Sequence, residues 1–137
     1  MKILAFIGGG RAGIDFLQSL FDSHPEISQL PGFFHYDEFW KKIEKDNVPK
    51  NIASKFIVDY EYFFDSRLYL IERHHMLGEA KNDYYLVNKK KFSESFINLF
   101  YDKEVNKKNV LYNLHYAYSL ASGEDLKKKK IIILNIH

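Results

Sequence analysis

The sequence predicts an α/β fold in which a parallel sheet is flanked by helices. Residues 3–7 form an uninterrupted apolar run, which is typical of a strand buried on both faces. A glycine-rich turn and a segment with helical spacing follow this run directly. A second, β-branched run lies at 131–136, and the long helical stretch between the two runs indicates that the strands are parallel.

The beginning of the chain is predicted to form a strand, a turn and a helix. We expect the strand over 1–8 and the helix over 12–22, where the apolar residues fall on one helical face. This helix ends before Pro25, because the residue that precedes a proline avoids the helical conformation. His24 is therefore expected to pack against the end of the helix or to cap it.

Helical spacing continues through the middle of the chain. One helix is predicted over 36–45 and another over 51–66, where apolar residues recur every four positions. A further helix is predicted over 68–76. The region between the two strands is therefore expected to be largely helical.

The last two helices are predicted from their end signals. Asn88 and Asn109 are suited to accept a hydrogen bond from the first turn of a helix, and Gly123 is suited to end the second one. The lysine run 127–130 is expected to be a solvated stop before the final strand, 131–136.

Length and charge limit the classes of protein. A chain of 137 residues favours a single domain, 1–137. Its 20 Lys and Arg residues against 18 Asp and Glu give a net charge of +2, which does not indicate nucleic acid as a partner. No apolar stretch approaches the roughly 20 residues of a membrane helix, and no signal-peptide pattern is present. A cytoplasmic protein is expected.

The residue types also argue against a metal site. The chain has no cysteine, which excludes a thiol nucleophile and a thiolate zinc site. His74 and His75 are adjacent in sequence, so on a helix their rings would point about 100° apart and would not share one ion. We therefore predict no metal.

Two parallel strands would make an incomplete sheet, because a parallel strand without neighbours leaves backbone groups unpaired. We therefore expect a fold truncated after its second strand, or a homo-oligomer that completes the sheet through the open edge. A non-enzymatic domain that binds a partner through this edge is one functional alternative.

The segment 8–15 is the most informative one for function. It places four glycines and Arg11 between the first strand and the first helix. Glycines allow the backbone to approach a ligand closely, and the free N–H groups at the start of a helix favour an anion such as phosphate. Arg11 adds a permanent cation whose planar fork can hold two phosphate oxygens at once.

Two known phosphate loops can be compared with this segment. A Walker A loop ends in Gly-Lys-Ser/Thr, and neither the lysine nor the hydroxyl is present here. Gly8, Gly10 and Gly13 do match the G-x-G-x-x-G spacing of a dinucleotide fold. That fold also needs a second strand that ends in an acidic residue, whereas this chain has Pro25 and Pro31 in that region. A Rossmann-type oxidoreductase that binds NAD(P) or FAD is the enzymatic alternative.

The loop and its surroundings resemble the sulfotransferase family. The resemblance covers about 3–40 and lies in Gly9-Gly10-Arg11-Ala12-Gly13, in Asp22-Ser23-His24-Pro25 and in Pro31-Gly32. It implies a P-loop-like sulfotransferase fold without a metal. It also implies transfer of a sulfuryl group from PAPS (3'-phosphoadenosine 5'-phosphosulfate) to a hydroxyl or amine of a small-molecule or glycan acceptor.

By this resemblance the loop binds the 5'-phosphosulfate. Arg11 takes the position of the family's basic residue, Ala12 that of its serine and Gly13 that of its glycine. Ile14 and Asp15 stand where the family commonly has two hydroxyl residues, so a carboxylate is set near a dianion. The donor-binding residues implied in this way are Gly9, Gly10, Arg11, Ala12, Gly13, Ile14 and Asp15.

The resemblance extends to the final strand and to the reaction. The strand 131–136 is similar to the one that in the family leads into the loop for the 3'-phosphate, and that loop is not in this chain. Sulfuryl transfer needs positive charge at the leaving phosphate and a base near the acceptor. Arg11 is expected to supply the charge. For the base we favour Glu38 over His35 and Asp37, all of which follow the turn at Pro31-Gly32.

Overall fold

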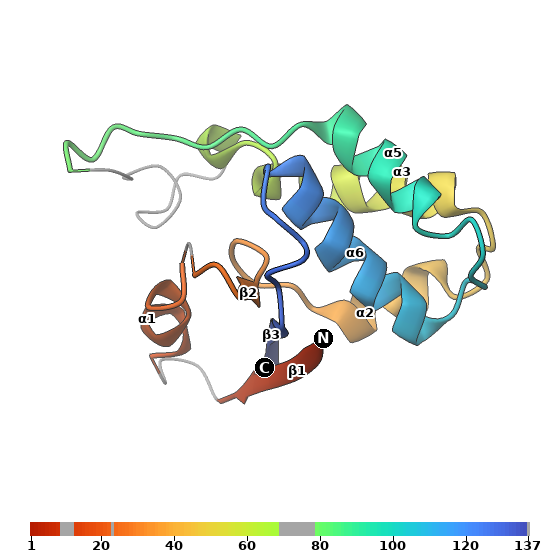
Figure 1. The fold of residues 1–137 in the computed structure, drawn as a ribbon, viewed down its shortest axis with the longest axis horizontal. Coiled ribbons are helices and arrows are strands. Elements are labelled where there is room, and N and C mark those ends of the chain that lie inside the picture. Colours follow the sequence, from red (N-terminus) through yellow and green to blue (C-terminus); the bar gives the residue numbers. More distant parts are fainter. Residues whose placement is uncertain (9–12, 23, 69–78, 137) are drawn as a thin grey trace.

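Three parallel strands form the sheet of the computed structural model (Figure 1). The central strand β3 (Ile131–Ile136) pairs along its full length with the edge strand β1 (Lys2–Ile7). The other edge strand, β2 (Ile27–Ser28), forms two residue pairs with β3. The parallel sheet and both predicted strands are confirmed. The model describes residues 1–8, 13–22, 24–68 and 79–136.

The expectation of only two strands is wrong, because β2 is a third one. It has two residues, which is too short to show any alternation of apolar and polar positions. Both of its residues are buried, Ile27 at 8% and Ser28 at 1% exposure. The strand therefore depends on packing that the local sequence does not reveal.

The prediction that β1 is buried on both faces is also wrong. Ile3, Leu4 and Ile7 are 43%, 44% and 79% exposed. The reason is the strand order, since β1 lies at the edge of the described sheet and only β3 pairs with it. In the central strand β3, by contrast, Ile132 and Ile133 are 0% and 3% exposed, as expected for a covered strand.

Helices lie on both sides of the sheet but leave much of β1 uncovered (Figure 1). On one face lies α1, and the Phe21 ring that follows it contacts Phe6 of β1 at a centroid distance of 6.0 Å. On the other face, α5 packs against both α3 and α6, with α2 beside them. The bounds of these helices are α1 Ile14–Ser19, α2 Tyr36–Ile43, α3 Pro49–Asp59, α5 Lys89–Asn98 and α6 Lys107–Ala121.

The predicted middle helices are confirmed in part. The helix expected over 36–45 corresponds to α2. The helix expected over 51–66 is too long, because Tyr60 leaves the helical region with φ −127° and ψ 42°. Two 3-10 turns follow this break, η1 (Glu61–Phe63) and η2 (Ser66–Leu68). Apart from Leu68, the helix expected over 68–76 lies outside the described residues.

The helix caps agree with the prediction in one of two cases. Asn88 caps α5, since its side-chain oxygen accepts a hydrogen bond from the Lys91 N–H at 2.8 Å. Asn109 does not cap α6. Asn106 does so, accepting from the N–H of Asn109 at 2.9 Å. Gly123, with φ +83°, follows the end of α6 in the left-handed conformation, as expected for a C-terminal stop.

The lysine run before β3 is only partly solvated, contrary to our expectation. The Lys129 side chain is 3% exposed. Its ammonium donates to the carbonyl of Ile27 at 2.7 Å and to a carboxylate oxygen of Glu124 at 2.8 Å. Lys129 therefore ties β2 to the segment that leads into β3.

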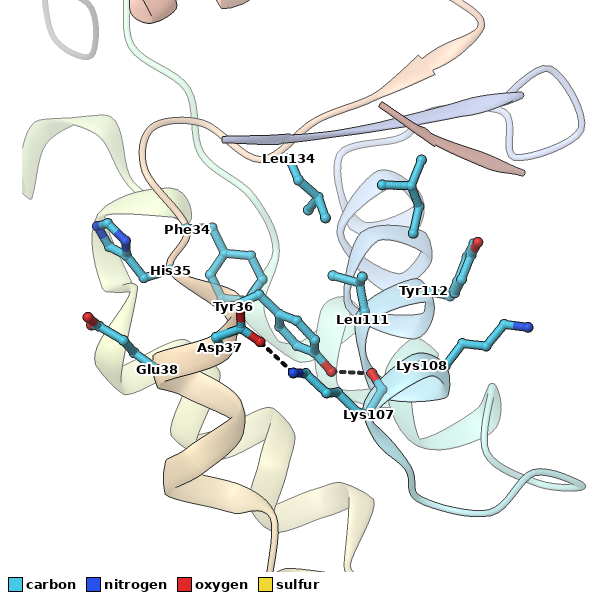
Figure 2. Close-up of a pocket in the computed structure, with 11 residues that line it drawn as sticks. Phe34, His35, Tyr36, Asp37, Glu38, Lys107, Lys108, Leu111, Tyr112 and Leu134 are labelled. Carbon is cyan, nitrogen blue, oxygen red and sulfur yellow. Dashed lines mark hydrogen bonds and ion pairs between the residues drawn. The ribbon is translucent and has the colours of Figure 1, made fainter. Parts of the chain in front are cut away.

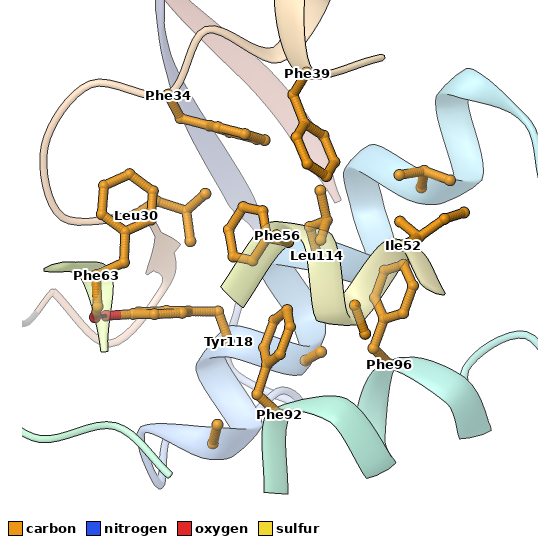
Figure 3. Packing of buried hydrophobic residues seen from close by; sticks show 14 of the residues in the cluster. Leu30, Phe34, Phe39, Ile52, Phe56, Phe63, Phe92, Phe96, Leu114 and Tyr118 are labelled. Atoms are coloured by element: carbon orange, nitrogen blue, oxygen red, sulfur yellow. Dashed lines mark hydrogen bonds between the residues drawn. The ribbon is translucent and has the colours of Figure 1, made fainter. Parts of the chain in front are cut away.

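The hydrophobic core lies in the layer of helices and is rich in phenylalanine (Figure 3). Phe56 of α3 is fully buried, stacks on Phe92 of α5 at 5.3 Å and meets Phe34 edge-on at 5.4 Å. The Tyr118 hydroxyl donates to the Phe63 carbonyl at 2.5 Å, which satisfies a polar group inside this core. No helix within the described segments has the length and apolar character needed to cross a membrane.

Candidate functional site

The loop that follows β1 begins at the carboxyl edge of the sheet. Because β1 and β3 are parallel, both strands end at this edge, which is where ligands bind in open α/β sheets. The loop ends at Gly13, whose φ of +73° is left-handed. A Cβ built there would meet no atom within 4 Å, so glycine is favoured by backbone conformation and not by lack of space.

Only part of the predicted donor loop can be placed. Gly9, Gly10, Arg11 and Ala12 lie outside the described residues. Gly13 and the first two residues of α1, Ile14 and Asp15, are placed, and the Ile14 side chain is buried at 8% exposure. With six residues, α1 has only a short helix dipole at this edge.

A pocket of about 560 Å³ lies on the face of the sheet opposite α1 (Figure 2). Its walls come from β1, β3 and the N-terminal turns of α2 and α6. Most of its interior is apolar, with charged side chains at the rim. The apolar and aromatic lining residues are Ile3, Phe34, Tyr36, Leu111, Tyr112 and Leu134, and the polar ones are His35, Asp37, Glu38, Lys107 and Lys108.

Two polar contacts hold α2 and α6 together at this pocket (Figure 2). The Lys107 ammonium forms an ion pair with Asp37 at 2.5 Å, and the Tyr36 hydroxyl donates to the backbone carbonyl of Lys107. The ammonium of Lys107 lowers the pKa of Asp37, whereas burial raises the pKa of Tyr36. At neutral pH Asp37 is therefore ionised and engaged, and Tyr36 is a neutral donor.

Glu38, the predicted base, lines this pocket from the first turn of α2. Within the described part of the chain its carboxylate makes no ion pair, whereas the neighbouring Asp37 is bound to Lys107. Glu38 is exposed, and in Figure 2 its side chain points away from the interior of the pocket. Of these two acids, Glu38 is the one with a carboxylate available to accept a proton.

The α6 side of the pocket was missed by sequence reasoning. One face of this helix carries Lys107, Lys108, Leu111 and Tyr112. Their spacing of three to five residues is visible in the sequence and indicates a shared helical face. Only the tertiary fold places this face opposite 34–38. The Tyr112 hydroxyl donates to the Met1 carbonyl at 3.3 Å, which links this face of α6 to the start of the chain.

A buried polar cluster joins α6 to β2. His115 of α6 is 1% exposed, and its Nδ1 lies 3.4 Å from the Ser28 hydroxyl, which lies 3.1 Å from that of Ser119. Burial lowers the pKa of His115 to about 3, so the imidazole is neutral at physiological pH. This histidine therefore contributes to the packing of α6 against β2 as a neutral, buried side chain.

The described segments contain no group of three or more residues suited to hold a metal ion. His74 and His75 lie outside those segments. Comparisons of this chain with protein-family models, with curated proteins and with solved structures find no match.

Proposed function

We propose that this chain is a sulfotransferase-like protein that binds PAPS at the loop after β1 and transfers its sulfuryl group to a hydroxyl or amine. One observation carries the proposal. The parallel pairing of β1 with β3 makes both strands end at the edge where the glycine loop leaves β1, and the left-handed Gly13 turns that loop into α1. This strand, loop and helix order is the one that the resemblance implies for the 5'-phosphosulfate.

The reaction assigns separate roles to Arg11 and Glu38. The bond between sulfur and the bridging phosphate oxygen breaks, and a new bond forms between sulfur and the acceptor oxygen or nitrogen. The Arg11 guanidinium would neutralise charge on the departing phosphate by two parallel N–H donors. The Glu38 carboxylate would take the proton that the acceptor loses.

The pocket between α2 and α6 is the proposed acceptor site. Its volume of about 560 Å³ is in the range of small-molecule sites. The apolar walls formed by Phe34, Leu111 and Leu134 favour an acceptor with an apolar body, whose hydroxyl or amine would lie at the rim near Glu38.

The test is calorimetric titration of the folded chain with PAP, the donor without its sulfuryl group. Arg11→Ala should weaken PAP binding by about tenfold to a hundredfold, since it removes charge-assisted hydrogen bonds to phosphate. Arg67→Ala is the matched control, because Arg67 is bound to Asp65 at 2.7 Å and belongs to η2, far from the loop in the sequence. Glu38→Gln should leave PAP affinity unchanged, because the donor site does not include it.

The same titration tests the dinucleotide alternative. The short strand β2 does follow α1, as a dinucleotide fold requires, but it ends at Ser28 and not in an acidic residue. Binding of NADH or NADPH without binding of PAP would replace our proposal with that alternative. Absence of PAP binding by the folded chain, or equal losses in Arg11→Ala and Arg67→Ala, would contradict it.

A further inference from the structure

β1 has a second hydrogen-bonding edge that no described strand uses. The Lys2 N–H donates to the Lys130 carbonyl at 2.8 Å, which starts the ladder to β3. Along a strand, the backbone groups of successive residues point to alternate sides. The even-numbered residues of β1 therefore bond to β3, and the N–H and C=O groups of Ile3, Ala5 and Ile7 point to the open edge.

The side chains at this edge are apolar and exposed. Ile3 and Ile7 are 43% and 79% exposed, and Leu4, on the other face of β1, is 44% exposed. On α1, which follows the loop after β1, Phe16 and Leu20 are 70% and 63% exposed. Edge strands of monomers are commonly protected by charges, prolines or bulges, and 3–7 contains no charged residue and no proline. Such a combined edge and apolar surface is typical of an interface.

We propose that β1 pairs antiparallel with β1 of a second copy of this chain, about a two-fold axis at Ala5. In this register Ala5 faces Ala5 of the partner subunit, and Ile3 faces Ile7 of the partner subunit. All three residues with open backbone groups then form hydrogen-bonded pairs, which gives about six bonds across the edge. A shift by two residues in either direction leaves at least one of the three without a strand residue opposite it.

The side chains of β1 are compatible with this self-pairing. The smallest residue of the strand, Ala5, lies on the axis, where two identical side chains must meet. Leu4 faces Phe6 of the partner subunit, so both faces of the joined sheet place apolar side chains opposite each other. The only charged residue of β1, Lys2, lies at opposite ends of the pair in the two copies, so like charges are kept apart.

The two-fold axis also involves α1. A stable interface buries about 800 Å² per partner, which a strand pair of this length does not supply alone. An axis perpendicular to the sheet keeps α1 of both copies on the same face. The exposed Phe16 and Leu20 of α1 then lie on the same side of the joined sheet in both copies. This assembly requires only β1 and α1, so it does not depend on the proposed function.

The first test uses the absence of cysteine in the chain. In the proposed register, Ala5→Cys places two thiols across the axis with Cα atoms about 5.5 Å apart, which is suitable for a disulfide. Mild oxidation should therefore give a covalent dimer on a non-reducing gel. Val58→Cys is the control, because Val58 is 75% exposed on α3, far from β1 in the sequence. Equal dimer yields from the two variants would overturn the register.

The second test measures association by sedimentation equilibrium. The unmodified chain should form dimers at about 100 μM, and Ile7→Lys should weaken the dimer by about tenfold or more, since it places charges at the edge. Val58→Lys introduces the same charge at a position of similar exposure and should leave association unchanged. A chain that stays monomeric, as it would if the edge served a strand of another protein, overturns the proposal. So does a dimer that Ile7→Lys does not weaken.

Discussion

Lys129 is a charged residue that the fold uses as an internal tie. Its ammonium donates to the Ile27 carbonyl and to Glu124 while the side chain is only 3% exposed. We predict that Lys129→Met lowers the free energy of unfolding by about 2 kcal/mol, because the Ile27 carbonyl is left buried without a donor. Urea denaturation followed by circular dichroism measures this difference. Lys128→Met is the matched control, and a loss as large as that of Lys129→Met would show that the buried contacts are not the cause.

His115 makes stability depend on pH. Its pKa is about 3 in the fold, against about 6.5 in the unfolded chain, so below pH 6.5 protons bind preferentially to the unfolded state. The stability due to the neutral ring is therefore complete above pH 6.5 and falls as the pH decreases towards 3. Between pH 7 and pH 5 the expected loss is about 2 kcal/mol.

Denaturation at several pH values tests this prediction. His115→Gln should remove most of the loss between pH 7 and pH 5, even if the variant is less stable throughout. His24→Gln changes an exposed histidine and should keep the slope of the unmodified chain. An unchanged slope in His115→Gln would assign the pH dependence to other groups.

Individual residues could be predicted from the sequence where their chemistry depends on nearby residues. Glu38 was chosen because the resemblance implies an acid or histidine after the turn at Pro31-Gly32, and it does line the pocket. The roles of Lys129 and His115 could not be predicted, because both residues contact β2, which is distant in the sequence. Lys129 is 102 residues from its partner Ile27, and His115 is 87 residues from Ser28. Arg11 and its glycine neighbours stay a prediction, since they lie outside the described residues.

Among the elements, α6 provides a test of how helix boundaries are set. Asn106 accepts from the N–H of Asn109 at 2.9 Å, and Asn109 in turn donates through its side chain to the Glu104 carbonyl at 3.0 Å. We predict that Asn106→Ala costs about 1 kcal/mol in the free energy of unfolding, because one N–H of the first turn loses its acceptor. Asn106→Asp keeps an acceptor and should cost little. Equal losses in these two variants would contradict the assignment of Asn106 as the cap.

The elements also show where patterns are informative. A β-branched run predicted β3, and helical spacing predicted α2, because both signals are repeated along the element. The end of α3 was misplaced because apolar residues keep their four-residue spacing beyond Tyr60, where the backbone has already left the helix. Spacing of this kind describes which side chains are buried and does not fix where hydrogen bonding stops.

Burial of apolar side chains differs strongly between the two parts of the molecule. The phenylalanine-rich core lies among α2, α3, α5 and α6, whereas β1 and α1 carry exposed apolar residues. Sequence reasoning expected an open sheet edge from the small number of strands, but it did not determine which strand lies there. That position follows from the order β1-β3-β2, which depends on long-range pairing between residues over a hundred positions apart.

This difference in burial predicts a pattern of amide hydrogen exchange in the molecule. Amides of α6 should exchange slowest, because its inner face is buried in the core. In β1, the amides of Leu4 and Phe6 should exchange more slowly than those of Ile3, Ala5 and Ile7, because only the even-numbered residues bond to β3. Exchange measured by NMR in dilute solution should show this alternation. At concentrations where the proposed dimer forms, the odd-numbered amides should become protected, because they then pair across the two-fold axis. Equal protection of all these β1 amides in a dilute monomer would contradict the assignment of β1 as an open edge strand.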